Sequence, residues 1–127
     1  MTHRKMKYQW GSGLVLMACA FAAHAATDCK PAKEGERPSH RVHWTTRSEI
    51  QSEGFEVFRS ERVDGDFVKI NDAPIPAAKN SVRPREYEYS DYAIDPCKVY
   101  FYYVEAVAIG GYRVKLTEPR QAGPKTQ

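Results

Sequence analysis

Hydrophobic and polar residues alternate with a period of two along several short runs that follow residue 40. The longest run extends from Val99 to Val107, and every second residue in it would share one face of a β-strand. The other runs are Arg41–Thr46, Gly54–Arg59, Phe67–Ile70, Tyr87–Asp91 and Tyr112–Thr117. Turn-forming residues separate the runs, and Gly110-Gly111 is placed for a tight hairpin. The pattern predicts an antiparallel all-β protein of about six or seven strands, because no run sustains a helical period.

Two packed sheets are the economical arrangement for such strands, since each sheet then buries one face. The residues expected to fill the core between the sheets are Trp44, Phe55, Val57, Tyr100, Tyr102 and Val104. The indole N–H of Trp44 will need a hydrogen-bond partner there.

The first 25 residues have a different pattern. Arg4, Lys5 and Lys7 give a basic start, the stretch Gly13–Ala23 is apolar, and Ala23-His24-Ala25 ends it with small residues at two positions. This order is typical of a secretory signal peptide, and we expect cleavage before Ala26. The apolar stretch is too short to cross a membrane, which takes about 20 residues. The alternative to a signal peptide is that this apolar stretch forms a buried N-terminal helix of the folded protein.

A lipoprotein signal is a second alternative. The tetrapeptide Leu16-Met17-Ala18-Cys19 resembles a bacterial lipobox, in which Cys19 would carry the lipid. Met17 fits that motif poorly, and the apolar stretch continues beyond Cys19. Lipid labelling that is lost on Cys19→Ala would favour the lipoprotein.

The charge balance depends on this signal. The chain has 19 basic and 16 acidic residues, a formal net charge of +3. Removal of residues 1–25 takes away three basic residues and no acidic one, so the remaining chain has no net charge. Binding to nucleic acid needs a surplus of cations, and we expect no nucleic-acid partner. We also expect no transmembrane span in the cleaved chain.

Two cysteines, Cys29 and Cys97, remain after cleavage. In an oxidising compartment such a pair is expected to form a disulfide bond. His40 and His43 lie in the same region, but no Cys-x-x-Cys or His-x-x-x-His spacing indicates a metal site. We expect no metal and no cofactor.

Several spaced motifs resemble a fibronectin type III domain, which has an immunoglobulin-like sandwich fold. They are Trp44, Gly54-Phe55-x-Val57 and the run Ile94-x-Pro96-x-x-x-Tyr100-x-Tyr102-x-Val104-x-Ala106. The stretches Gly54–Ser60, Asp64–Ile70 and Ile75–Ser81 further resemble a variant of the family that is common in exported bacterial proteins. The resemblance implies a tyrosine corner, in which the Tyr100 hydroxyl bonds to an upstream backbone carbonyl.

The resemblance covers residues 41–119, preceded by an N-terminal segment 26–40 and followed by a polar tail 120–127. Residues 27–40 make a poor first strand, since they contain two prolines, a glycine and no alternation. A full first strand would begin about 20 Å from the turn that carries Cys97, and bridged Cα atoms lie within about 7 Å. A disulfide between Cys29 and Cys97 therefore implies a first strand that is short or displaced.

No residue pattern indicates catalysis, so we expect no enzyme and no catalytic residue. The serines lie outside any G-x-S-x-G turn, His43 points away from the core, and Asp64 and Asp66 flank a turn glycine. By the parity of the strands, Phe58, Phe101 and Tyr103 face outward together, either as cross-strand pairs or as an interaction patch.

These features predict an exported, non-enzymatic binding or structural module of the bacterial envelope or exterior, either periplasmic or extracellular. A protein or glycan partner is possible and is not identified by the residues. The alternatives are a lipoprotein anchored through Cys19 and a small protein inhibitor that uses the loop 71–84.

Overall fold

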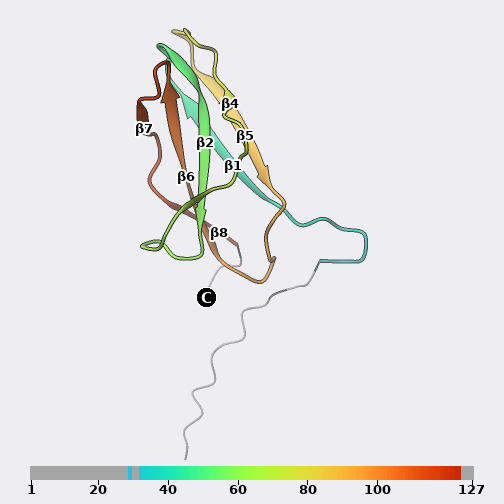
Figure 1. The fold of residues 1–127 in the computed structure, drawn as a ribbon. Helices are drawn as coiled ribbons and strands as arrows, with labels where there is room; N and C mark the ends of the chain where they lie inside the picture. The colour runs from blue at the N-terminus through green and yellow to red at the C-terminus, as the bar shows by residue number, and fades with distance from the viewer. Residues whose placement is uncertain (1–28, 30–31, 124–127) are drawn as a thin grey trace, which may run out of the picture.

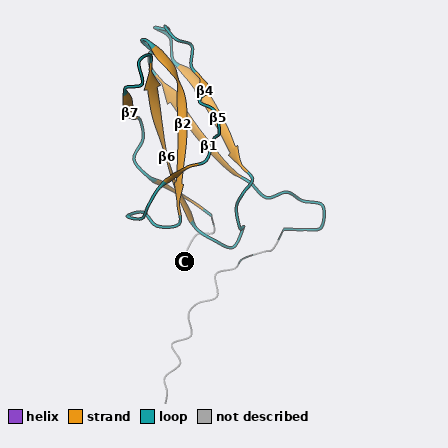
Figure 2. Cartoon of the chain, in the orientation of Figure 1, coloured by secondary structure: helices purple, strands orange, loops and turns teal. Residues whose placement is uncertain are grey.

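Every regular element in the computed structural model, which describes Cys29 and residues 32–123, is a β-strand (Figures 1 and 2). The strands are β1 (His40–Thr46), β2 (Ser52–Ser60), β3 (Val68–Lys69), β4 (Ile75–Pro76), β5 (Arg85–Asp91), β6 (Tyr100–Ala108), β7 (Arg113–Lys115) and β8 (Arg120–Ala122). The signal peptide predicted for residues 1–25, Cys19 included, lies outside the described residues.

The strands form two antiparallel sheets that face each other, as in a β-sandwich. β1 and β5 make a two-stranded sheet, with His40 opposite Asp91 and Thr46 opposite Arg85. The second sheet has six strands, in the order β3-β2-β6-β7, with β4 also paired to β2 and β8 to β6. Figure 1 shows the β1–β5 layer lying across the β2–β6 layer. The predicted all-β, antiparallel fold is confirmed.

The core lies between these layers and contains all six residues expected there. The buried cluster is Trp44, Phe55, Val57, Tyr100, Tyr102 and Val104. The Trp44 ring stacks on Tyr87 at 5.6 Å between centroids and meets Phe55 edge-on at 5.5 Å. The partner expected for the Trp44 indole N–H is missing: Nε1 is buried and has no hydrogen-bond acceptor in the described part of the chain.

All of the runs predicted from alternation contain a strand, and two further strands were not predicted. β4 lies inside the stretch expected to be a loop, where Pro74 and Ile75 approach Gly54 so closely that a Cβ there would lie 2.7 Å from the Ile75 carbonyl oxygen. β8 lies inside the stretch expected to be a polar tail from residue 120, and it pairs with the first residues of β6. Neither strand alternates, because one is two residues long and the other is mostly polar.

The N-terminal segment carries no strand between residues 32 and 39. Cys29 and Cys97 form the predicted disulfide bond, with Cα atoms 5.1 Å apart. This bond ties the segment to the turn between β5 and β6 rather than along the side of β1. In consequence the described strands pair with only one of the two edges of β1.

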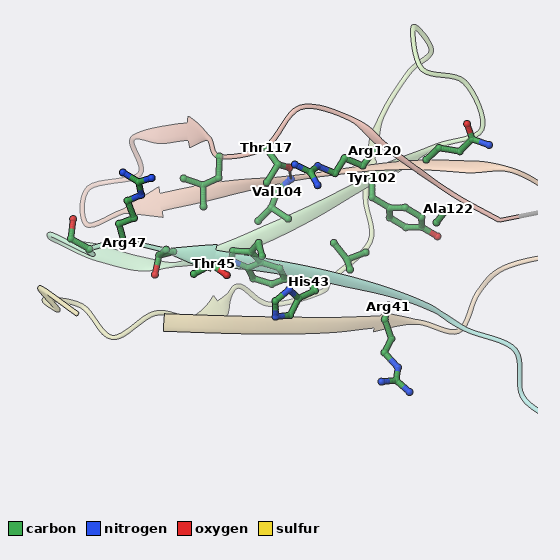
Figure 3. Close-up of a pocket in the computed structure, with 15 residues that line it drawn as sticks. Arg41, His43, Thr45, Arg47, Tyr102, Val104, Thr117, Arg120 and Ala122 are labelled. Atoms are coloured by element: carbon green, nitrogen blue, oxygen red, sulfur yellow. Dashed lines mark hydrogen bonds between the residues drawn. The ribbon is translucent and has the colours of Figure 1, made fainter. Parts of the chain in front are cut away.

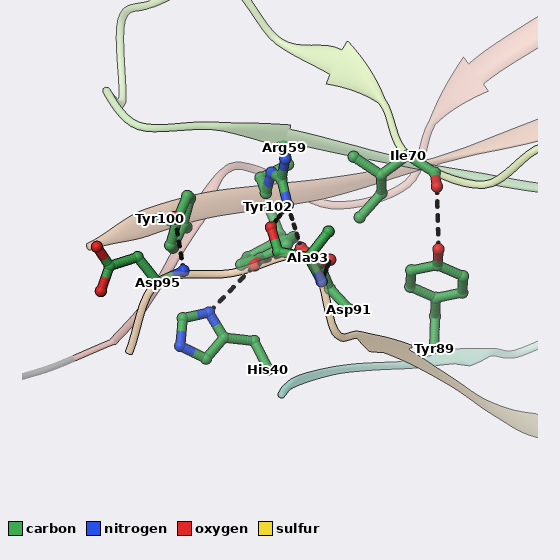
Figure 4. Close-up of polar contacts among 9 residues, drawn as sticks. All are labelled: His40, Arg59, Ile70, Tyr89, Asp91, Ala93, Asp95, Tyr100 and Tyr102. Carbon is green, nitrogen blue, oxygen red and sulfur yellow. Dashed lines mark hydrogen bonds and ion pairs between the residues drawn. The ribbon is translucent and has the colours of Figure 1, made fainter. Parts of the chain in front are cut away.

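The turn between β5 and β6 is anchored by Tyr100, as Figure 4 shows. The backbone N–H of Asp95 donates to the Tyr100 hydroxyl at 3.0 Å. The sequence predicted that this hydroxyl would donate to an upstream carbonyl, so the direction of the bond was wrong. The turn presents an amide N–H to the Tyr100 hydroxyl oxygen, while the Asp95 carbonyl already accepts the N–H of Lys98.

Candidate functional site

A groove of about 720 Å³ runs along the open edge of β1. One wall is β1 with the two residues that follow it, and the other is formed by β6 and the chain from Leu116 to Ala122 (Figure 3). Among the described residues no strand pairs with this edge of β1, and the groove lies along it between the two sheets. Its floor is apolar or aromatic, with Trp44, Tyr102 and Val104 contributing.

The charged side chains that line the groove are all basic. They are Arg41, Arg47 and Arg120, accompanied by His43, and no lining residue is acidic. Arg41 reaches Glu88 at 3.9 Å and His43 reaches Glu86 at 4.0 Å, both among exposed side chains. Within residues 29 and 32–123, Arg47 and Arg120 form no ion pair. The groove is therefore a locally basic surface on a domain without a basic surplus.

The aromatic residues predicted to face outward do lie on one face, the outer face of the six-stranded sheet. Phe58 and Tyr103 are directly opposite in the β2–β6 register and stack with centroids 4.9 Å apart. Phe67 packs against Tyr103 at 4.9 Å, and the Lys115 ammonium lies 4.6 Å from the same ring centroid. Phe101 lies opposite Ser60 on one side and Gln121 on the other.

All of these rings are half-buried, so much of their surface already packs within the sheet. No sequence signal placed Phe67 beside Tyr103, because the alternating run that contains Phe67 is short. Cross-strand pairing accounts for the contact between Phe58 and Tyr103.

A buried carboxylate lies farther along the same outer face. Glu56 is 3% exposed and is opposite Glu105 in the β2–β6 register. Arg113 bonds to its Oε2, and the Lys69 Nζ lies 3.4 Å from its Oε1. Burial alone would raise the pKa of Glu56, but the hydrogen bonds and charges of Arg113 and Lys69 outweigh it and hold that pKa below its ordinary value.

A second buried carboxylate, Glu49, joins the loops at the other end of the sandwich. Its Oε1 accepts the hydroxyls of Thr46 at 2.7 Å and Tyr87 at 2.6 Å, and its Oε2 accepts the Ala78 N–H at 2.6 Å. Burial acts to raise the pKa of Glu49, and these three hydrogen bonds more than offset it, so that the pKa is lowered. No sequence signal marked Glu49.

The same carboxylate holds the loop that the sequence proposed for an inhibitor. The backbone groups of Glu49 and Ser81 exchange two hydrogen bonds of 2.7 Å, and Asn80 accepts the Gln51 N–H at 3.0 Å. The loop 71–84 is thus attached at several points, and Val82 projects from it with 88% of its surface exposed.

A polar cluster links the two sheets near the start of β1. The Asp91 carboxylate accepts from Arg59 at 2.8 Å and from the Tyr102 hydroxyl at 2.9 Å (Figure 4). His40 Nδ1 lies 3.1 Å from the same hydroxyl. Because Tyr102 gives its only proton to Asp91, Nδ1 of His40 is the donor. Burial and the Asp91 charge raise the pKa of Tyr102, so the phenol stays protonated.

The described part of the chain contains no group of three or more His, Cys, Asp or Glu side chains placed to hold a metal. Asp64, at the predicted turn, forms an ion pair with Arg62 at 3.1 Å. Among the same residues, no helix has the length and apolar character needed to span a membrane.

Comparison with protein-family models, with curated proteins and with solved structures finds no match to this chain. Its function is therefore inferred from the geometry of its own residues.

The pKa directions predict how stability changes with pH. Burial lowers the pKa of His40, Asp91 opposes the shift and Arg59 adds to it. A group whose pKa is lowered by folding contributes stability above its unfolded pKa and loses it as the pH falls. We expect the free energy of unfolding to decrease slightly below about pH 6.5, through His40, and steeply below about pH 4.5, through Glu49 and Glu56.

Urea unfolding measured from pH 8 to pH 3 checks this profile. His40→Gln should remove the shallow decrease and keep the steep one. A free energy of unfolding that rises between pH 7 and pH 5 would contradict the assignment.

Proposed function

We propose that this chain is an exported, non-enzymatic binding module, built on a fibronectin type III-like sandwich, that engages its partner through the groove beside β1. The groove carries the proposal, because it combines a strand edge left unpaired within the described residues, an apolar floor and charged side chains that are all basic. The signal-like N-terminus and the disulfide between Cys29 and Cys97 support a periplasmic or extracellular site of action.

The outer aromatic patch of Phe58, Phe101 and Tyr103 is the competing surface. Its rings are half-buried, and Tyr103 is already in contact with Phe58, Phe67 and Lys115. The rings also stand on β2 and β6, whose edges are paired on both sides, whereas the groove adds the edge of β1 that no described strand pairs with to the contact that a partner can make.

Affinity capture from the envelope fraction of the producing cell tests the proposal with two matched double variants. Leu116→Glu/Arg120→Glu alters the groove, and Phe101→Ala/Tyr103→Ala alters the patch. We expect the groove variant to lose the captured partner and the patch variant to keep it. If only the patch variant loses the partner, binding belongs to the outer face of the six-stranded sheet. Capture of no partner by the wild-type protein would overturn the binding module.

A further inference from the structure

The free edge of β1 has the features of a place for one more strand. β1 is seven residues long, and β5 is its only partner among the described strands. In an antiparallel pair, backbone groups that do not bond to the neighbour point to the opposite edge. An edge left in this state is a template for pairing with another chain. The described residues 32–39, which come before β1, supply no such strand.

The buried indole of Trp44 is an independent observation at the same place. Trp44 is 4% exposed and lines the groove, and its Nε1 has no acceptor within the described residues. Buried polar groups are nearly always hydrogen-bonded, so an indole N–H without an acceptor needs an explanation. Because Nε1 itself is buried, a backbone carbonyl or an acidic side chain in the groove would supply the acceptor only after a small shift of the ring or of its cover.

We propose that the groove binds an extended, acidic segment of a partner polypeptide, which adds to β1 as a further strand. This inference depends on the proposed function and names the chemistry of the partner. The main-chain groups of the segment bond to the edge of β1, its alternate apolar side chains enter the groove over Trp44 and Val104, and its carboxylates meet the arginines.

The charge of the groove favours an acidic segment as the bound partner. Arg41 lies near the start of β1 and Arg47 just beyond its end, while Arg120 lines the opposite wall (Figure 3). The lining contains no carboxylate, but Glu88 and Glu86 of β5 lie 3.9 Å from Arg41 and 4.0 Å from His43. Arg47 and Arg120, which form no ion pair within the described residues, therefore contribute most to attracting an acidic segment and repelling a basic one.

The same arginines disfavour a second copy of this chain. Two β1 strands paired antiparallel about Trp44 would place Arg41 of one copy opposite Arg47 of the other. Like charges directly opposite each other destabilise a strand pair. The exposed charges on this edge therefore act against self-association and leave it open to an acidic partner.

The probe for the test is a displayed library of random twelve-residue peptides, selected against the exported, disulfide-bonded protein. We expect the enriched peptides to alternate apolar residues with Asp or Glu. A synthetic peptide of the enriched sequence should bind at least about tenfold more weakly to Arg47→Glu/Arg120→Glu than to wild type. The matched control, Arg62→Glu/Arg83→Glu, reverses two exposed arginines outside the groove and should bind like wild type.

Nuclear magnetic resonance identifies the mode of binding. Once residues 1–25 are removed, Trp44 is the only tryptophan, so the spectrum has a single indole N–H signal. With the peptide bound, we expect that signal to shift, and alternate amides of β1 to become protected from hydrogen exchange.

Enrichment of no peptide, equal binding to the groove variant, or shifts confined to Phe58, Phe101 and Tyr103 would each overturn the inference. Protection of the β1 edge before any peptide is added would also overturn it, because the chain's own upstream residues would then fill the groove. If the peptide experiments fail but affinity capture finds a partner that binds through the groove, the proposed binding module is supported and only the added strand is rejected. Failure of the capture experiment rejects the module itself.

Discussion

Breaking the disulfide by Cys29→Ser/Cys97→Ser is expected to lower the free energy of unfolding by about 4 kcal/mol. The bond closes a loop with a sequence separation of 68, so its loss gives the unfolded chain much additional conformational freedom. In the folded protein the bond ties the segment before β1 to the turn between β5 and β6, and the buried core contacts do not include it. Urea unfolding of the variant beside the oxidised wild type measures the difference.

The single variant Cys29→Ser is the matched control, and it should lose as much stability as the double variant. Reduction of the wild-type protein should give the same value. A loss below about 1 kcal/mol would show that the reduced chain keeps its loop closed by other contacts, which would contradict the entropic argument.

Glu49→Ala is expected to cost about 3 kcal/mol of unfolding free energy. The substitution removes the acceptor of two hydroxyls and one backbone N–H, and it leaves these donors in a site where Glu49 itself is 2% exposed. The loop 71–84 should loosen at the same time, which amide exchange at Ala78 and Ser81 would report as loss of protection.

Glu53→Ala is the control for this prediction, because Glu53 is an exposed glutamate of the neighbouring β2 and its side chain forms no hydrogen bond or ion pair with the described residues. It should change stability by no more than about 0.5 kcal/mol. Equal effects of the two substitutions would mean that the Glu49 hydrogen bonds contribute nothing net to folding.

The part of the fold that can be predicted from the sequence is the part determined by the local alternation of hydrophobic and polar residues. In a strand of period two, the position of Trp44 or Tyr102 in the sequence decides which face it occupies, so the core follows from the alternation alone. The partner of Cys29 followed from counting, since only Cys97 remained.

The rest depends on how distant segments meet. Glu49 is stabilised by Thr46, Ala78 and Tyr87, and no local spacing shows that these three converge. β8 is polar and short, so only its pairing with β6 reveals it. The poor first strand was readable from residues 27–40, but which side chains line the resulting groove depends on the path of the chain after β7.

The disulfide also determines how the domain would carry mechanical load. A pull applied between Cys29 and the C-terminal end passes through the sulfur atoms to Cys97, so it bypasses β1 to β5 and acts only on β6, β7 and β8. The bypassed stretch would add about 230 Å of extended length if it were released. In the oxidised protein that length stays locked, and only reduction of the bond makes it available to stretch.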